Sequence, residues 1–514
     1  EMTSSLVGSE MCIRDSHLSD TVALIGENNS GKSNLLRAVT LPFLTDEAGF
    51  SGKNLSWTDI NNDAKKEYYQ FILDNQKPIA AGTISSEELI KRMPVVTVEV
   101  HLEPEKTEGY FVKDLSYSIE GGQIVYGLRY EYKPSKVENI YSAVKGVLTS
   151  EILDEKSIAT VKMNLLPTEY YSYSVGVPGK GSVSYDVLKL YKYIALEAER
   201  DEFSRTRERI GSKSLVKLFQ MGLTDGDKLK VEKEYNNFFE QLRSISKMDQ
   251  VINWQDESDL KEAKEFFSHI SIMPNMPPMQ TILTSIRLGY SDAELSLQGL
   301  GYRNLILLFV LINSLAGKQN DIALNVLTIE EPEAHLCINN IRLMVSFLKV
   351  FTAKNPSTQL FYSTHSTEFI NKLDLKNVVV MHEGQAFSLM DELDESGRDY
   401  LAKNPNLDLF KLLFSKKCIL FEGISEEMLI RAYIDSRHEL SDIELLSFHK
   451  GFIDIIEIWK KVNHSTGNRL GIIRDYDNQK GADMLTICKD IARGELHEFQ
   501  MPKHIQEVLD FLKN

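Results

Sequence analysis

The sequence predicts an α/β fold in which short apolar strands run into glycine-rich or acidic loops and then into helices. A strand at Thr21–Ile25 is followed by a glycine-rich loop and a helical stretch at Asn34–Val39. A second strand, Leu324–Ile329, runs directly into acidic residues. Farther along, Cys418–Phe421 and Leu470–Ile473 are short apolar strands that also end in carboxylates. Apolar runs of this length are typical of buried strands.

Composition and charge limit the class of protein. With 514 residues, 42% of them hydrophobic and 26% charged, the chain is long enough for more than one globular core. Its net charge of −16 excludes a general basic coat, so contact with a nucleic acid would need a local patch or a metal ion. The scattered cysteines, Cys12, Cys337, Cys418 and Cys488, argue against a disulfide framework or a structural zinc site. No apolar run is long enough to span a bilayer, so we expect a cytoplasmic protein with no membrane partner.

The opening segment, residues 1–16, has neither the period of a strand nor that of a helix. It resembles translated sequencing-adapter read-through, so it is an unreliable segment to which we assign no structural element. The first readable element is therefore the strand at Thr21–Ile25.

A phosphate-binding loop follows that strand. Residues 26–33 read GENNSGKS and match the pattern G-x-x-x-x-G-K-[ST], with a strand before and a helix after, as the pattern requires. Backbone N–H groups of such a loop surround an anion, Lys32 reaches the terminal phosphates, and Ser33 offers a hydroxyl to Mg²⁺. A chance glycine-rich turn is the alternative, which the agreement of strand, spacing, Lys and Ser disfavours. The predicted nucleotide-binding residues here are Gly26, Asn28, Asn29, Ser30, Gly31, Lys32 and Ser33.

An acidic strand end supplies the second half of such a site. Leu324–Ile329 runs into Glu330, Glu331, Pro332 and Glu333. A carboxylate in this position can hold Mg²⁺, and its neighbour can polarise the water that attacks the γ-phosphate. We assign Glu330 to the metal and Glu331 to the catalytic base. A buried strand with a solvated acidic turn is the alternative, an even choice by itself but a weaker one beside a phosphate loop.

A glycine-rich segment precedes a second apolar helix. Ser296, Gly299 and Gly301 stand directly before the helical run Leu305–Leu315. Small residues and backbone N–H groups at a helix start can dock a second anion, so these three residues are further nucleotide-binding candidates. An ordinary glycine-rich helix start is the alternative.

A histidine at the end of another strand adds a catalytic candidate. The strand Gln359–Tyr362 is followed by Ser363, Thr364 and His365. The imidazole of His365 can hydrogen-bond a γ-phosphate from there, although a lone histidine after a strand is as often structural. The motifs around it favour the catalytic interpretation.

The region between the two halves of the site is globular. It shows no sustained heptad, which argues against a long coiled coil. Val95–Leu102 alternates like a half-buried strand, and Ile124–Tyr132 predicts another. Apolar and aromatic residues from Val231 to Ile245 recur every three to four positions, which predicts an amphipathic helix in a helical insert at about residues 203–275. Its apolar stripe packs either in the core of the insert or against a second copy of the chain.

The C-terminal part carries a different arrangement of carboxylates. After a linker at residues 401–414, Glu422 ends one predicted strand, while Asp475 and Asp477 follow another. Carboxylates at the ends of two parallel strands can converge on one rim and coordinate one or two Mg²⁺ ions for phosphodiester cleavage. Two solvated acidic turns are the alternative.

Taken together, the motifs resemble those of ABC-type ATPases of the SMC, RecF and OLD (overcoming lysogenization defect) group, in which they occur in the same order. The wordings GENNSGKSN, GLGYRNL and EEPEAH look most like the OLD family. The resemblance implies an ATPase head at residues 17–400 with a helical dimerisation insert, in which two heads sandwich ATP and Ser296 and Gly299 act on the partner's nucleotide. Cys337 stands where relatives usually begin a His-Pro pair, and Glu330 stands where many ATPases carry Asp.

The OLD resemblance also implies that a Toprim nuclease domain follows the head, at residues 415–514. In that case Glu422 and Glu426 bind metal, Glu422 serves as general base, and Asp475 and Asp477 bind the same cluster of Mg²⁺ or Mn²⁺ ions. Relatives place a further acidic residue and a Lys downstream of the D-x-D motif. So little chain follows Asp477 that we expect an incomplete domain.

The function implied by this resemblance is that of an ATP-binding, Mg²⁺-dependent DNA endonuclease in which nucleotide binding regulates cleavage, in anti-phage defence of the Gabija type. The implied partners are DNA, a second copy or a higher homo-oligomer, and a helicase. The alternative is a RecF-type ATPase that senses or repairs DNA and uses its C-terminal domain for docking. A primase-like or topoisomerase-like use of the Toprim fold is disfavoured, because no zinc ribbon or strand-passage Tyr motif is evident.

Overall fold

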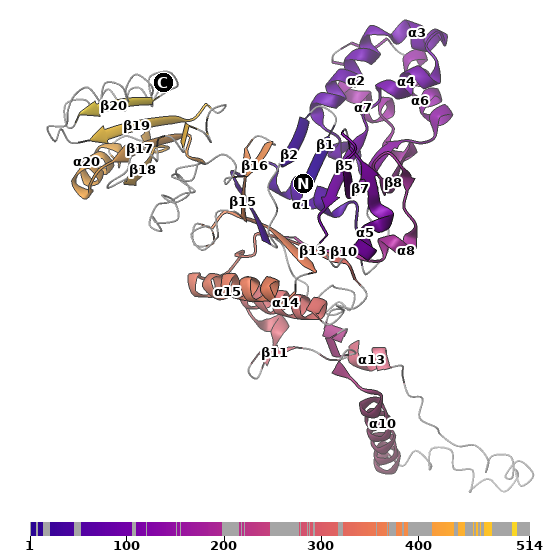
Figure 1. The fold of residues 1–514 in the computed structure, drawn as a ribbon, viewed down its shortest axis with the longest axis vertical. Coiled ribbons are helices and arrows are strands. Elements are labelled where there is room, and N and C mark those ends of the chain that lie inside the picture. Colours follow the sequence, from indigo (N-terminus) through magenta and orange to yellow (C-terminus); the bar gives the residue numbers. More distant parts are fainter. Residues whose placement is uncertain are drawn as a thin grey trace, which may run out of the picture. The chain divides into compact units, whose positions relative to one another are not determined.

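The computed structural model describes most of the chain, and the described residues form two compact units (Figure 1). One unit consists of Glu1–Ala198 with Asp321–Asn514, and the other of Glu199–Asn320. Described residues are 2–6, 9–13, 21–45, 53–104, 109–119, 121–150, 152–154, 156–197, 222–246, 279–284, 293–316, 322–355, 357–366, 377–382, 385–388, 414–435, 440–447, 467–474 and 496–500, with short stretches between them. The predicted linker at 401–414 lies outside these residues except for its last position.

A parallel sheet forms the centre of the first unit. Its strand order is β16-β15-β3-β14-β13-β10-β4, and only β16 runs antiparallel to its neighbour. The strands are β3 (Thr21–Gly26), β4 (Leu44–Thr45), β10 (Tyr191–Leu196), β13 (Leu324–Glu330), β14 (Thr358–Thr364), β15 (Val378–His382) and β16 (Gln385–Ser388). The predicted strands at 21–25, 324–329 and 359–362 are confirmed.

The register of this sheet determines which strand ends meet. β14 lies between β3 and β13, with Thr364 opposite Ile25 and Ser363 opposite Glu330. Because the three strands are parallel, their carboxyl ends share one edge of the sheet, where ligands of open α/β sheets usually bind. The three site-bearing segments of the sequence are thereby brought to one edge.

Two helices follow the site strands. α1 (Lys32–Thr40) begins directly after the glycine-rich loop, contacts β13 and β14, and buries Leu35 and Val39. α15 (Ile338–Lys354) contacts β14 and buries Leu348. The predicted helix at 34–39 is therefore confirmed, and it starts two residues earlier than expected.

An antiparallel sheet belongs to the same unit. Its order is β2-β1-β5-β7-β8-β9, with β6 beside β7. The strands are β1 (Met2–Leu6), β2 (Ser9–Ile13), β5 (Val96–Leu102), β6 (Ser116–Ser118), β7 (Ile124–Pro134), β8 (Tyr171–Val177) and β9 (Gly181–Ser182). The predicted strands at 95–102 and 124–132 are confirmed. One continuous core of buried residues, including Val22, Tyr68 and Val98, joins this sheet to the central one.

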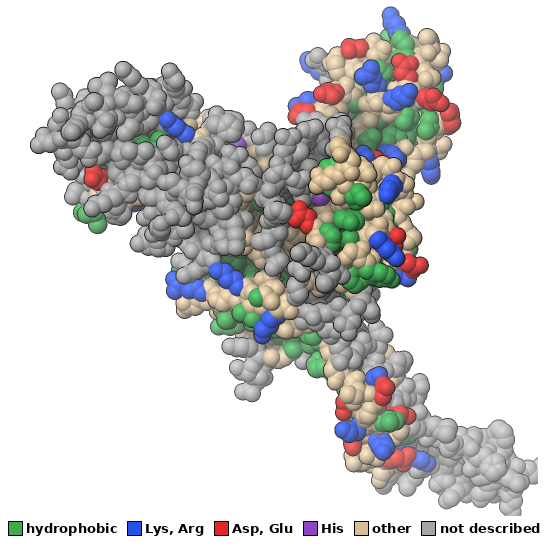
Figure 2. Space-filling view, in the orientation of Figure 1, with side chains coloured by type: hydrophobic (Ala, Val, Ile, Leu, Met, Phe, Trp, Pro, Cys, Tyr) green, Lys and Arg blue, Asp and Glu red, His purple; other side chains and the backbone are tan. Residues whose placement is uncertain are grey.

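Further helices belong to the first unit. They are α2 (Asn62–Asp74), α3 (Gln76–Ala81), α4 (Ser86–Arg92), α5 (Gly109–Val112), α6 (Val137–Ser150), α7 (Ile158–Leu165) and α8 (Tyr185–Leu188). Among them, α2, α3, α4, α6 and α7 form one group (Figure 1). Figure 2 shows acidic and basic side chains interspersed over the group of helices from α2 to α7. The face of these helices in that view therefore has no single-sign patch of the kind that attracts a polyanion.

The opening segment corrects one expectation. We assigned no element to residues 1–16, yet β1 and β2 pair there with Met2 opposite Ile13, and β1 pairs with β5 with Leu6 opposite Val96. Backbone hydrogen bonding along the edge of β5 provides an order that the side-chain pattern does not indicate.

A smaller parallel sheet lies at the C-terminal end of the first unit. Its order is β18-β17-β19-β20, formed by β17 (Lys417–Phe421), β18 (Glu444–Ser447), β19 (Arg469–Arg474) and β20 (Leu496–Gln500). β17 and β19 are parallel neighbours with Phe421 opposite Ile473, so both predicted strands are confirmed. α20 (Ile424–Asp435) includes the predicted helical stretch at 427–433. Ile419, Phe421, Ile430 and Ile473 belong to the core of this sheet.

The second unit is mostly helical. α10 (Asp225–Ser246) confirms the predicted amphipathic helix, and its Phe238 and Ile245 are 60% and 80% exposed. Much of the predicted insert at 203–275 lies outside the described residues, so its two packing alternatives stay open. The other elements are α13 (Met279–Thr284), β11 (Gly289–Tyr290), β12 (Ala293–Glu294), η4 (Leu295–Leu297) and α14 (Leu300–Ala316). Among the described residues, no helix is both long and apolar enough to cross a membrane.

A substitution of Gly26, the last residue of β3, tests how tightly the glycine-rich loop is packed. A Cβ atom at this position would collide with the backbone carbonyl oxygen of Met381 and with Ser30 Oγ. We expect Gly26→Ala to lower the free energy of unfolding by about 1–3 kcal/mol, because a backbone atom cannot turn away. Gly146→Ala in α6 is the matched control, since no atom lies within 4 Å of its new Cβ. Equal melting temperatures for the two variants would contradict the close packing around Gly26.

Candidate functional site

The loop between β3 and α1 has the shape of an anion cradle. Asn29 and Gly31 have positive φ angles of 64° and 101°, which turn successive backbone N–H groups toward one side. The turn is closed by a hydrogen bond from Ser30 N to Glu27 O at 3.3 Å, and α1 starts with Leu35 N donating to Gly31 O at 2.9 Å. The N–H groups of the loop and the positive end of the α1 dipole therefore lie together at the N-terminus of α1.

Lys32 is folded back over this loop. Its Nζ donates to the carbonyl oxygens of Gly26 at 3.0 Å and Glu27 at 2.7 Å, and the residue is only 6% exposed. Burial lowers the pKa of the Lys32 ammonium. Three nearby carboxylates, of Glu331, Glu27 and Glu333, oppose that shift. The cation therefore lies in a partly desolvated, acid-lined position where a phosphate can replace the two carbonyl oxygens.

Two hydroxyl groups of the loop have different surroundings. Ser33, the second residue of α1, is exposed. Ser30 is buried, and its Oγ has no hydrogen-bond partner in the described part of the chain. A buried polar atom without a partner is costly, so Ser30 Oγ is suited to an additional ligand.

The end of β13 presents two of the predicted acidic residues. Glu330 is the last residue of the strand, and Glu331 follows with a positive φ of 42°. The Glu331 backbone N–H donates to Ser363 O at 3.0 Å and also approaches Ser363 Oγ at 3.3 Å. Its side chain is 44% exposed, so the carboxylate can reach water while its backbone is anchored to β14.

His365, directly after β14, comes close to Glu331. Its Nε2 lies 3.7 Å from Glu331 Oε1. Burial lowers the pKa of His365, the Lys32 charge lowers it further, and Glu331 opposes the shift. The ring is therefore neutral at pH 7, with one nitrogen able to donate and the other to accept. The structure thus brings together Lys32, Glu331 and His365, which the sequence places in three separate motifs.

Glu333 lies beside these residues, and the local motifs predict no role for it. Its Oε1 accepts hydrogen bonds from Thr364 Oγ1 at 2.6 Å, His365 N at 2.9 Å and Ser366 N at 3.2 Å. Burial raises the pKa of the Glu333 carboxyl against the effect of these donors. The signal in the sequence is the third glutamate of EEPE, which Pro332 separates from the first two.

The second glycine-rich segment lies in the other unit. Ser296 is in η4, and its side chain lies outside the described residues. Gly299 precedes α14 with open space where a Cβ would stand, and Gly301 is in the first turn of α14. Leu300 and Tyr302, between and beside these glycines, are 40% and 44% exposed. The segment therefore presents small residues and a helix start to solvent.

The C-terminal carboxylates are only partly described. Glu422 directly follows β17 and is partly buried, whereas the side chain of Glu426 in α20 lies outside the described residues. Asp475 and Asp477 also lie outside them. The described residues contain no group of three or more His, Cys, Asp or Glu that would hold a metal ion. β17 and β19 are parallel neighbours. In the sequence, Glu422 follows β17 and the D-x-D motif follows β19.

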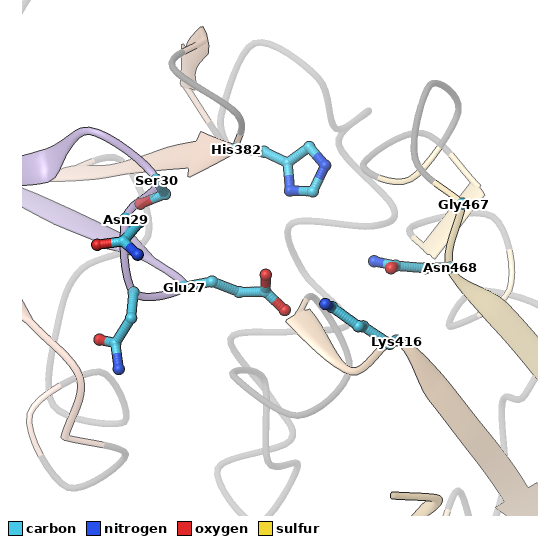
Figure 3. Close-up of a pocket in the computed structure, with 8 residues that line it drawn as sticks. Glu27, Asn29, Ser30, His382, Lys416, Gly467 and Asn468 are labelled. Carbon is cyan, nitrogen blue, oxygen red and sulfur yellow. The ribbon is translucent and has the colours of Figure 1, made fainter.

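A cavity of about 270 Å³ lies against the outer side of the glycine-rich loop (Figure 3). Its lining residues are Glu27, Asn28, Asn29, Ser30, His382, Lys416, Gly467 and Asn468. In Figure 3 the side chains of Glu27 and Lys416 extend toward each other across it. The predicted loop residues Asn28 and Asn29 are exposed in this region, so their side chains contact solvent rather than the core.

The chain is similar in part to a curated protein and to several solved structures. A 26% identical match over 182 residues, 29% of this chain and 26% of the relative, is to Endonuclease GajA of Bacillus cereus (strain HuB5-5). The match thus spans about a quarter of that relative's length. Among solved structures, an Smc head bound to the C-winged helix domain of ScpA has a TM-score of 0.35 at 11% identity, covering 76% of this chain and 98% of that one. Stu0660 of Streptococcus thermophilus has a TM-score of 0.34 at 10% identity, covering 95% and 98%.

A family model matches more of the chain than the GajA relative does. It is described as the AAA ATPase domain and matches residues 12–370, well over half of the chain. The matched range includes the glycine-rich loop, the acidic end of β13 and His365. The chain therefore belongs to the AAA ATPase domain family.

Proposed function

We propose that the chain hydrolyses ATP at the shared edge of β3, β14 and β13. The observation that carries this proposal is the convergence there of Lys32, Glu331 and His365, with 3.7 Å between His365 Nε2 and Glu331 Oε1. The loop residues Gly26, Asn28, Asn29, Ser30 and Gly31 surround the phosphates with backbone N–H groups, together with Lys32 and Ser33.

Each charged group has a separate role in the proposed reaction. Ser33 and Glu330 would hold Mg²⁺, which neutralises charge on the phosphate oxygens when bound. The exposed carboxylate of Glu331 orients the attacking water and accepts its proton. His365 is neutral, so it can donate a hydrogen bond to the γ-phosphate without adding a second cation beside Lys32. The fixed backbone of Glu331 keeps this geometry before substrate binds.

A second copy of the chain completes the proposed site. Ser296, Gly299 and Gly301 are proposed to contact the nucleotide bound to the partner's glycine-rich loop. The open space at Gly299 and the exposure of Leu300 and Tyr302 support this role, because a segment that meets another molecule must be accessible. The exposed apolar residues of α10 are a candidate for further contact between copies.

We further propose that the C-terminal sheet cleaves DNA with Mg²⁺ or Mn²⁺, as a Toprim nuclease regulated by the nucleotide. Glu422, with Glu426, Asp475 and Asp477, would hold the ions, and Glu422 would act as general base. The adjacency of β17 and β19 and the name of the GajA relative support this proposal. Anti-phage defence in the cytoplasm, beside a partner helicase, is the proposed setting.

The competing proposal is an ATPase that senses or repairs DNA without cutting it. The family match, which ends at residue 370, supports the ATPase part that both proposals share. In that case the sheet of β17 to β20 serves for docking.

Glu331→Gln tests the hydrolysis proposal. We expect it to lower kcat for ATP by about 100-fold or more, since the amide cannot accept the proton from water, while ATP affinity is kept. EDTA is expected to abolish the activity of the unaltered chain, because Mg²⁺ is lost. Phosphate release is the measurement, and Glu131→Gln in β7, a carboxylate 3.2 Å from Arg129 and far from the motifs in sequence, is the control. Unchanged kcat in Glu331→Gln would remove this residue from the chemistry.

Plasmid nicking tests the nuclease proposal. With Mg²⁺ or Mn²⁺, we expect the chain to nick DNA and both Asp475→Ala and Glu422→Ala to abolish nicking. The matched control is Glu427→Ala, which removes a neighbouring carboxylate whose partner is Arg431 at 2.7 Å on the surface of α20. Assays with and without ATP, and with Lys32→Ala, tell whether nucleotide drives or restrains cleavage. Two results favour the non-nuclease alternative: nicking that persists in Asp475→Ala, and no nicking by the unaltered chain with either metal ion.

A further inference from the structure

We propose that Glu333 is a positioning residue for ATP hydrolysis, which holds His365 at its working distance from Glu331. This inference rests on the proposed ATPase function and adds a residue to which neither the motifs nor the comparisons give a role. Glu333 need not touch the nucleotide in this account. It acts through the segment that carries the histidine.

The contacts of the Glu333 carboxylate define the role. One oxygen, Oε1, accepts three hydrogen bonds, from Thr364 Oγ1 at 2.6 Å, His365 N at 2.9 Å and Ser366 N at 3.2 Å. All three donors belong to consecutive residues at the point where β14 ends. A single acceptor therefore fixes the backbone on both sides of His365.

A second link between the same two strand ends makes the arrangement rigid. The Glu331 backbone N–H donates to Ser363 O at 3.0 Å, so the β13 end is tied to β14 one residue before the Glu333 contacts. Pro332, between the two glutamates, is buried and has a restricted φ angle. The two links set the separation of Glu331 and His365, which lie on different strands and are 3.7 Å apart at their side chains.

Glu333 is half-buried, and its surroundings indicate a role beyond packing. Its Oε2 is buried and has no hydrogen-bond partner in the described part of the chain. The ion pairs found within the described residues do not include Glu333 either. A desolvated carboxylate with an unsatisfied oxygen destabilises a fold, so fold stability alone does not account for Glu333. Its negative charge also acts on Lys32, which places it in the electrostatic surroundings of the site.

Four variants separate positioning from a merely structural role: Glu333→Ala, Glu333→Gln, His365→Ala and the Glu333→Ala/His365→Ala double variant. Glutamine keeps one carbonyl oxygen that can accept from Thr364 and the two N–H groups, so Glu333→Gln is the conservative rescue. Glu131→Ala is the control for loss of a carboxylate elsewhere in the same unit. The measurements are kcat and KM for ATP, with melting temperatures recorded for every variant.

We expect Glu333→Ala to lower kcat about 10-fold or more with little change in KM, and Glu333→Gln to keep most of the activity. Because Glu333 acts through His365, the double variant should be no slower than His365→Ala alone. Multiplicative losses in the double variant, or equal losses in Glu333→Gln and Glu333→Ala, would overturn the proposal. So would an unchanged kcat in Glu333→Ala.

A readout without turnover separates failure of this inference from failure of the proposed function. In ¹⁵N-histidine-labelled protein, the ring signals of His365, assigned with His365→Ala, report its surroundings even if the unaltered chain hydrolyses no ATP. We expect Glu333→Ala to shift or broaden these signals and Glu333→Gln and Glu131→Ala to leave them in place. Unchanged His365 signals in Glu333→Ala overturn the positioning role, whatever the ATPase assay gives.

Discussion

The position of β14 between β3 and β13 is the constraint on which the candidate site depends. Parallel pairing on both sides, with Thr364 opposite Ile25 and Ser363 opposite Glu330, brings three segments distant in sequence to one edge. The loop after β3 carries backbone N–H donors, the residue after β13 is a glutamate, and the residue after β14 is a histidine. A shift of one residue in either register would turn the strand residues that precede these groups to the opposite face of the sheet.

The buried Lys32 ammonium is central to the electrostatics of that edge. In a chain with a net charge of −16, Lys32 is the positive group among Glu27, Glu331 and Glu333, and its Nζ is held by two backbone carbonyl oxygens. The pKa of His365 is lowered by burial and by that same cation, so the histidine stays neutral. The loop N–H donors, the Lys32 cation and the N-terminus of α1 therefore favour an incoming polyphosphate, while the surrounding carboxylates oppose it.

The strands that carry the motifs could be predicted from sequence because most of their residues are apolar, as in Leu324–Ile329 and Cys418–Phe421. The site was predictable to the extent that local motifs define it. The contacts of Glu333 could not be predicted, because they are hydrogen bonds to residues 31 to 33 positions away. The pairing of β1 with β5 was missed for the same reason, since edge pairing involves the backbone and leaves little pattern in the side chains.

Isothermal titration calorimetry with a non-hydrolysable ATP analogue and Mg²⁺ shows directly whether the chain binds nucleotide. We expect one nucleotide for each chain, and at least about 10-fold weaker binding to Lys32→Ala, because a charge-assisted hydrogen bond to phosphate is lost. Failure of the unaltered chain to bind the analogue, or equal affinity in Lys32→Ala, would contradict the assignment of the edge formed by β3, β14 and β13 as the nucleotide site.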